Sequence, residues 1–145
     1  MSSMRQLVVS ASVCLSLGVS PALAANWTYS GDPDIAVGAL GHESDHIKFL
    51  TSGTYTLSAD VNLAQVSLGP LGQTGRHIIM DFRPDNHKVT QAGNLGICDG
   101  NTIVELLGGV WDLGRYNFGF NKDGTLGSAR NDILLDGCIV TNAAI

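Results

Sequence analysis

Apolar and polar residues alternate over several short stretches of this chain, and no long stretch shows the spacing of an amphipathic helix. Residues 46–50, 53–57 and 77–82 alternate in this way, which is typical of half-buried strands. Gly, Asn, Asp and Pro repeatedly interrupt helical spacing. The best candidate helix is short and covers residues 34–40. The pattern therefore predicts an all-β fold with one short helix.

Two later segments, residues 102–111 and 131–140, carry the same pattern 29 positions apart. In both, alternate apolar residues are followed by a glycine and then by a further apolar residue. A weaker copy, Ile78 and Met80, lies 26 positions before Val104 and Leu106. A period of 20 to 50 residues indicates a solenoid, whose coils bury their apolar rows against one another. A β-sandwich with coincidental spacing is the alternative. The matched pairs are Val104 with Ile133, Leu106 with Leu135, Gly108 with Gly137 and Trp111 with Val140.

These residues resemble a known family. The run from Ile47 to Leu57 looks like the opening of right-handed parallel β-helix proteins of the pectate-lyase-like superfamily, which ends in Gly-Thr-Tyr; here Leu50-Thr51-Ser52 replaces the usual proline. The segments around Val104 and Ile133 resemble the coil repeat of that family. The resemblance covers roughly residues 33–145 and implies a right-handed parallel β-helix, with residues 34–40 as its amino-terminal capping helix.

The end of the sequence affects this interpretation. Stacked coils leave an unpaired edge and an apolar face unless a cap covers them. Residues 140–145 follow directly on an apolar strand and contain no capping segment. We therefore interpret the chain as the amino-terminal part of a longer protein or as a truncated product.

The first 24 residues have the layout of a cleavable signal peptide. Arg5 supplies a positive charge, residues 7–19 are apolar, and Ala22-Leu23-Ala24 forms a small-residue ending. The apolar stretch is shorter than the roughly 20 residues that a membrane span needs. A buried helix of the folded domain is the alternative. The sequence thus predicts a secreted or periplasmic protein with one mature domain, residues 25–145, and no membrane span in the mature chain.

Composition narrows the range of partners. The whole chain has 8 basic and 13 acidic side chains, a net charge of −5, and loss of Arg5 with the signal makes the balance one unit more negative. No basic stripe is present to neutralise phosphates, so nucleic acid is not expected as a partner. Of the mature cysteines, Cys98 and Cys138 lie out of phase around a coil; a disulfide between them stays open, and Cys138 is expected to be a buried thiol.

The longest segment outside the repeat, residues 112–130, supplies the candidate binding residues. Tyr116, Phe118 and Phe120 alternate, which would put their rings on one side of a strand. With Asp112 and Arg115 they would form a platform on which sugar rings stack while the charged groups bind hydroxyls or uronic carboxylates. The alternative is that the rings cover the coil surface beneath the loop.

Other residues suggest chemistry less specifically. His42-Glu43-Ser44-Asp45-His46 matches the zinc-protease signature, but Gly38 and Gly41 oppose a helix there and no third ligand follows, so a polar loop and no metal site are expected. Nothing in the spacing selects a catalytic pair from the scattered acids, and the hydrolase motifs of the family are absent, so no catalytic residue is assigned. These acids are Asp81, Asp99, Asp132 and Asp136.

Taken together, the residues and the resemblance predict a secreted β-helix protein that acts on or binds an extracellular polysaccharide, as a lyase or a glycoside hydrolase would. A lyase-like enzyme would use calcium, and the resemblance implies no other cofactor. A non-catalytic surface or adhesin module is the alternative, because a fold does not fix a function.

Overall fold

The computed structural model describes residues 24–69, 75–97, 102–120 and 132–144. These residues form one short helix, α1 (Ile35–Gly38), and three sheets of short strands. Sheet A, in spatial order, consists of β1 (Asn26–Thr28), β2 (His46–Phe49), β5 (Gln65–Leu68), β8 (Leu95–Ile97) and β11 (Phe118–Phe120). Sheet B consists of β3 (Gly53–Thr56), β6 (His77–Asp81), β9 (Ile103–Leu107) and β12 (Asp132–Asp136), and sheet C of β4 (Val61–Leu63), β7 (Lys88–Gln91), β10 (Val110–Asp112) and β13 (Ile139–Thr141).

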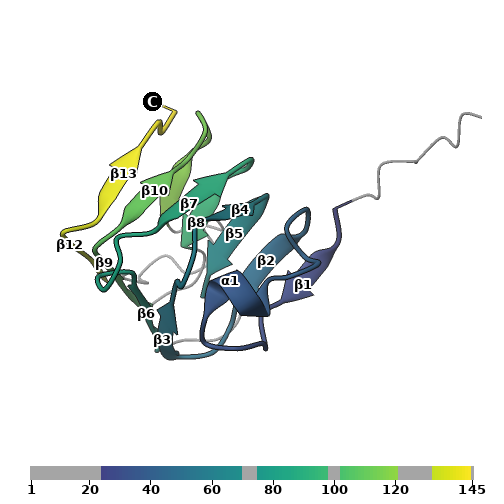
Figure 1. The fold of residues 1–145 in the computed structure, drawn as a ribbon, viewed down its shortest axis with the longest axis horizontal. Coiled ribbons are helices and arrows are strands. Elements are labelled where there is room, and N and C mark those ends of the chain that lie inside the picture. Colours follow the sequence, from purple (N-terminus) through teal and green to yellow (C-terminus); the bar gives the residue numbers. More distant parts are fainter. Residues whose placement is uncertain (1–23, 70–74, 98–101, 121–131, 145) are drawn as a thin grey trace, which may run out of the picture.

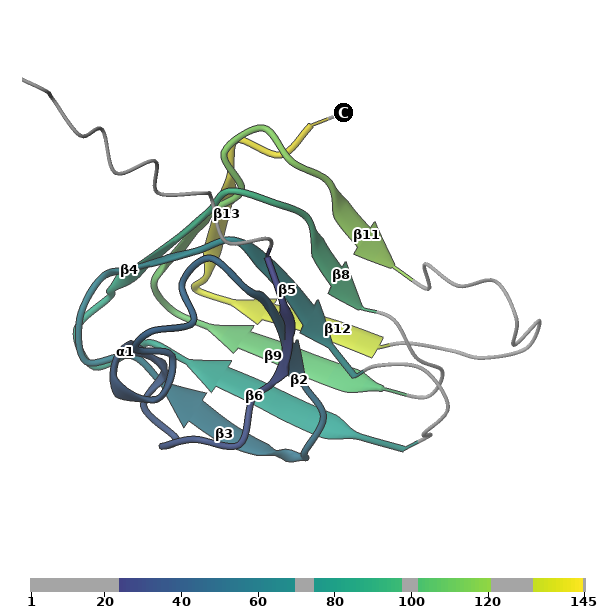
Figure 2. The same cartoon turned by 90° about the vertical axis from the view of Figure 1, so that its right-hand side faces the viewer.

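From β3 onward the chain passes through sheets B, C and A in a repeating order, and each pass is called a circuit below. Every strand from β5 onward pairs in parallel with the strand three places earlier. Seen from the amino-terminal end, the sheets form the three sides of a triangle (Figure 2), and the circuits follow one another along the longer direction of Figure 1. All of these pairings are parallel, so the antiparallel β-sandwich alternative is wrong.

The repeat read from the sequence matches the register of sheets B and C. Val104 pairs with Ile133 and Leu106 with Leu135, and the weaker copy is also in phase, because Ile78 pairs with Val104. The offset of 29 positions is therefore confirmed as one circuit. The spacing between successive strands varies along the chain, and in sheet B the pair β6 and β9 is 26 positions apart, which explains the offset of the first copy.

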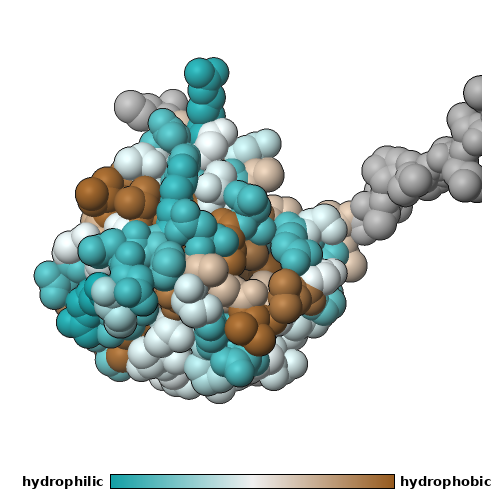
Figure 3. Space-filling model, in the orientation of Figure 1, coloured by the Kyte–Doolittle hydropathy of each residue, from teal (hydrophilic) through white to brown (hydrophobic). Residues whose placement is uncertain are grey.

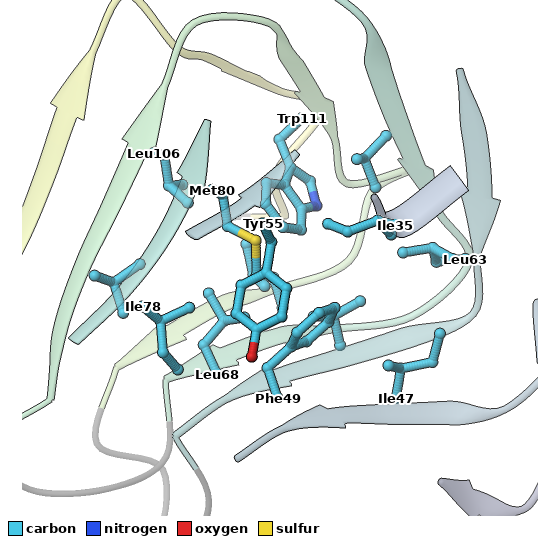
Figure 4. Packing of buried hydrophobic residues seen from close by; sticks show 14 of the residues in the cluster. Ile35, Ile47, Phe49, Tyr55, Leu63, Leu68, Ile78, Met80, Leu106 and Trp111 are labelled. Atoms are coloured by element: carbon cyan, nitrogen blue, oxygen red, sulfur yellow. The ribbon is translucent and has the colours of Figure 1, made fainter. Parts of the chain in front are cut away.

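The core fills the interior of the triangle. Apolar side chains from all three sheets point toward one another there, as the labelled residues of Figure 4 show. Trp111 is almost fully buried, and its indole nitrogen donates a 2.6 Å hydrogen bond to Oε1 of Gln91, which is buried as well. A buried Trp needs such a partner for its N–H, so the pair fixes Trp111 between two circuits.

The amino-terminal end of the core is covered by α1 and an aromatic cluster. The carboxylate of Asp34 caps the helix by accepting a 3.0 Å hydrogen bond from the N–H of Ala36. Ile35 and Ala39 are buried, and the rings of Tyr29 and Phe49 stack 4.5 Å apart. The short helix predicted over residues 34–40 is confirmed, although it ends at Gly38.

At the other end, the last circuit exposes apolar side chains. Leu106 is 1% exposed, whereas Leu135, its partner one circuit later, is 48% exposed. Ile139 on β13 is also exposed. Position along the stack, rather than residue type, therefore decides burial in these rows.

Candidate functional site

Asp112, the first residue of the predicted binding set, lies on the outer face of sheet C and joins three circuits. Its carboxylate lies 2.7 Å from Nζ of Lys88 on β7 and accepts a 2.8 Å hydrogen bond from Nδ2 of Asn142, which follows β13. It also accepts a hydrogen bond from the N–H of Gly114. The Lys88 ammonium and then Asn142 lower the pKa of Asp112 to about 2. Asp112 is thus held in a network within the protein.

The remaining predicted residues separate into exposed and core-facing positions. Arg115 is an exposed turn residue with φ of 75°, and Tyr116 is 42% exposed. Phe118 pairs with Leu95 and packs against the core, so its ring is not part of an exposed platform with Tyr116. The side chain of Phe120 lies outside the described residues.

A hollow of about 180 Å³ lies on the outer face of sheet A. Ser67, Gly96 and Gly119 are register partners on β5, β8 and β11. The two glycines lack side chains and form the floor of the hollow. Ser67 is held by a 2.8 Å hydrogen bond to Nε2 of His46. The side chains that line the hollow are neutral groups that donate or accept hydrogen bonds, together with one apolar residue: Gln65, Ser67, Asn94, Leu95 and Asn117.

Two asparagines fix one side of this hollow. The N–H of Asn117 donates a 3.0 Å hydrogen bond to Oδ1 of Asn94 one circuit earlier, and the carbonyl of Asn117 accepts from the N–H of Leu95. None of the residues that line the hollow belongs to the binding set predicted from the sequence. The signal that could have found them is a repeated Asn-x-Gly, at residues 94–96 and 117–119, with an apolar residue on either side of each glycine.

Charged residues gather instead on the outer face of sheet B. Nε2 of His77 lies 2.6 Å from Oε1 of Glu105, and Arg83 makes two hydrogen bonds to the carboxylate of Asp81, of 2.8 and 2.6 Å. Asp132 and Asp136 lie on β12 of the same sheet, while Asp99 lies outside the described residues. The structure thus brings Asp81 into a charged cluster that the sequence spacing did not select.

Six described carboxyl groups have a pKa below the ordinary value, which is opposite to the shift of a general acid. A general acid needs a raised pKa to hold its proton at neutral pH. Hydrogen bonds from Arg83 lower the pKa of Asp81, and the pKa of five further carboxyl groups is lowered as well. The groups concerned are Asp34, Glu43, Asp45, Asp60 and Asp112.

The zinc-protease-like string forms a loop that runs into β2. His42 stacks on Trp27, with ring centroids 3.8 Å apart, and its Nδ1 lies 2.8 Å from Oδ2 of Asp45. His46 belongs to β2 and bonds to Ser67. The two histidines therefore lack the helical backbone that the zinc motif requires. In the described ranges, no three His, Cys, Asp or Glu side chains come together as a metal site would need.

Cys138 is a free, half-buried thiol whose pKa burial raises to about 11. It packs against the core, as expected for the apolar face. Cys98 lies outside the described residues.

The part of the chain that the structure describes contains no helix with the length and apolar character needed to cross a membrane. Comparison of the sequence and the structure with protein-family models, curated proteins and solved structures finds no match.

Proposed function

We propose that this chain is a secreted or periplasmic right-handed parallel β-helix that binds an extracellular polysaccharide through the hollow on sheet A. The fold part of the proposal is supported by the cyclic order of the three parallel sheets, and by the Gly53-Thr54-Tyr55 opening that resembles the pectate-lyase-like superfamily. The predicted signal peptide supports export.

The observation that carries the binding proposal is the chemistry of the hollow. Sugar hydroxyls are neutral donors and acceptors, and amide and hydroxyl side chains match them. Gln65, Ser67, Asn94 and Asn117 supply such groups around a glycine floor, which lets a sugar ring approach the backbone closely. Among the residues that the structure describes, no charged side chain lines the hollow. We therefore favour a neutral polysaccharide over a polyuronate.

The lowered pKa values among the described carboxyl groups support binding without cleavage. Glycoside hydrolysis needs one carboxyl group with a raised pKa beside a second carboxylate, whereas hydrogen bonds lower the pKa of Asp81 and of Asp112. This favours the non-catalytic surface module over the glycoside hydrolase. No step through calcium is proposed.

The test compares two glycine variants that add the same side chain. A Cβ added at Gly119 meets no described atom within 4 Å, so Gly119→Val should extend into the hollow. A Cβ added at Gly53 also meets no described atom within 4 Å, and Gly53 lies on sheet B, so Gly53→Val is the matched control. Binding is measured by affinity electrophoresis in gels that contain neutral glucans, xylan or galactan, or the acidic polymers pectate and alginate. Reducing ends and unsaturated products are followed in parallel.

We expect retardation by at least one neutral polymer, with affinity about tenfold weaker in Gly119→Val because hydrogen bonds are lost. Gly53→Val should bind like the wild type, and no product should form. Equal binding by both variants, or no retardation in any gel, would refute the proposed site. Product release would refute the non-catalytic interpretation.

A further inference from the structure

The strand β4 has one open edge. It is the terminal strand of sheet C and pairs only with β7 among the described strands. The carbonyl of Leu63 accepts a 2.9 Å hydrogen bond from the N–H of Ala92, next to β7. In a parallel ladder, residues alternate between the two sides, so the N–H and C=O of Asn62 are directed away from β7. β4 therefore presents a donor and an acceptor at its free edge.

An apolar groove of about 340 Å³ lies between this edge and α1. Ile35 and Leu63 are buried at its base, whereas Leu40 is 68% exposed. Val37 on α1 is 51% exposed as well, and Figure 3 shows hydrophobic residues gathered over the region of α1. A free strand edge beside an apolar groove is the arrangement that accepts an added strand, whose backbone pairs with the edge while alternate side chains enter the groove.

The acidic residues of the groove favour an added strand with basic side chains. Glu43 and Asp60 both line the groove, and both are highly exposed. Backbone N–H groups hold each carboxylate: that of Gly41 donates to Glu43, and that of Lys88 donates to Asp60. A second copy of this chain fits poorly, because its net charge of −5 would be repelled.

We propose that the groove between β4 and α1 binds an extended segment of a separate protein in which apolar residues alternate with lysine or arginine. The segment adds to the free edge of β4 through the backbone of Asn62. Its apolar side chains pack against Ile35 and Leu40, and its basic side chains lie beside Glu43 and Asp60. This interaction is independent of polysaccharide binding on sheet A.

Two substitutions at Asn62 separate the backbone from the side chain. Asn62→Pro removes the N–H at the free edge, where proline is tolerated because no ladder hydrogen bond within the sheet is lost. Asn62→Ala keeps the N–H and is the matched control. Circular dichroism and thermal unfolding of both variants show whether the fold is retained. Glu43→Gln tests the charge without altering the strand edge.

The probes are two labelled, acetylated peptides, Lys-Val-Lys-Val-Lys and Glu-Val-Glu-Val-Glu, titrated with the purified protein and followed by fluorescence anisotropy. We expect the lysine peptide alone to bind, about tenfold more weakly to Asn62→Pro than to Asn62→Ala. Glu43→Gln and added salt should both weaken binding. Equal binding of the two peptides, no binding of the lysine peptide, or equal affinity for the two Asn62 variants would overturn the proposal. Concentration-dependent self-association in sedimentation, abolished by Asn62→Pro, would overturn it in favour of a second copy.

Discussion

Gly108 and Gly137 provide a test of how closely successive circuits pack. Each follows the sheet B strand of its circuit and has φ of 66°, a left-handed conformation that favours glycine. Alanine at either position therefore incurs a similar backbone strain of about 1–2 kcal/mol. The two sites differ in their surroundings, so comparing them separates strain from packing.

At Gly108, an added Cβ would lie 2.8 Å from Cα of Arg83 and 3.1 Å from its backbone nitrogen, both in the preceding circuit. That backbone is held in place, because the N–H of Phe82 donates a 2.8 Å hydrogen bond to the carbonyl of Leu107. At Gly137, the nearest atoms are 3.9 Å away, which is an ordinary contact. The clash should cost roughly 1–3 kcal/mol in addition to the strain.

We therefore expect Gly108→Ala to lower the free energy of unfolding by about 2–5 kcal/mol, and Gly137→Ala by about 1–2 kcal/mol. Urea denaturation followed by tryptophan fluorescence measures both, because Trp111 is buried in the core. Equal losses in the two variants would show that the circuits do not approach as closely as described, and the reasoning would fail.

Three further predictions concern burial and charge. Leu106 is 1% exposed, so Leu106→Ala should lower the free energy of unfolding by about 3 kcal/mol. Leu135 is 48% exposed, so Leu135→Ala should lower it by less than about 1.5 kcal/mol. A larger loss at Leu135 in urea denaturation would contradict the exposure of the last circuit. Folding lowers the pKa of Asp112 from 3.8 to about 2, so the ionised carboxylate stabilises the protein above pH 4 and this effect is lost as the pH falls toward 2. The unfolding temperatures of the wild type and of Asp112→Asn should therefore converge over that range. A constant difference between them would count against the network with Lys88. Folding raises the pKa of the Cys138 thiol from 9.0 to about 11. Its alkylation at pH 8 should therefore be at least about tenfold slower in the folded protein than in the urea-unfolded protein. Equal alkylation rates, measured by peptide mapping, would rule out the raised pKa.

The sequence predicts the long strands of sheet B and their register, because strong alternation and a glycine recur together in them. Val104 and Ile133 share both signals. The strands of sheets A and C are only three or four residues long, and among them only β2 shows an alternation that the sequence analysis could use. The circuits also differ in length, so no single period covers the chain.

The candidate site was harder to predict for a different reason. Alternation groups residues by face, but it does not tell which face meets the core. Tyr116 and Phe118 were grouped by their spacing, yet Phe118 packs inward while Tyr116 is exposed. The floor of the hollow is formed by Gly96 and Gly119, which carry no functional group, so only the repeated Asn-x-Gly spacing marks it in the sequence.

Disulfide crosslinking along one outward row of sheet B tests the stacking of circuits most directly. Ile79, Glu105 and Leu134 are register partners on successive strands, so neighbours lie about 4.8 Å apart and the outer two roughly 10 Å. In a background without the native cysteines, the pair Glu105→Cys with Leu134→Cys should oxidise readily, because a disulfide spans about 4.4–6.8 Å between Cα atoms. The pair Ile79→Cys with Leu134→Cys should stay reduced. Failure of the adjacent pair to crosslink, or efficient crosslinking of the distant one, would contradict the parallel stacking on which this account of the protein depends.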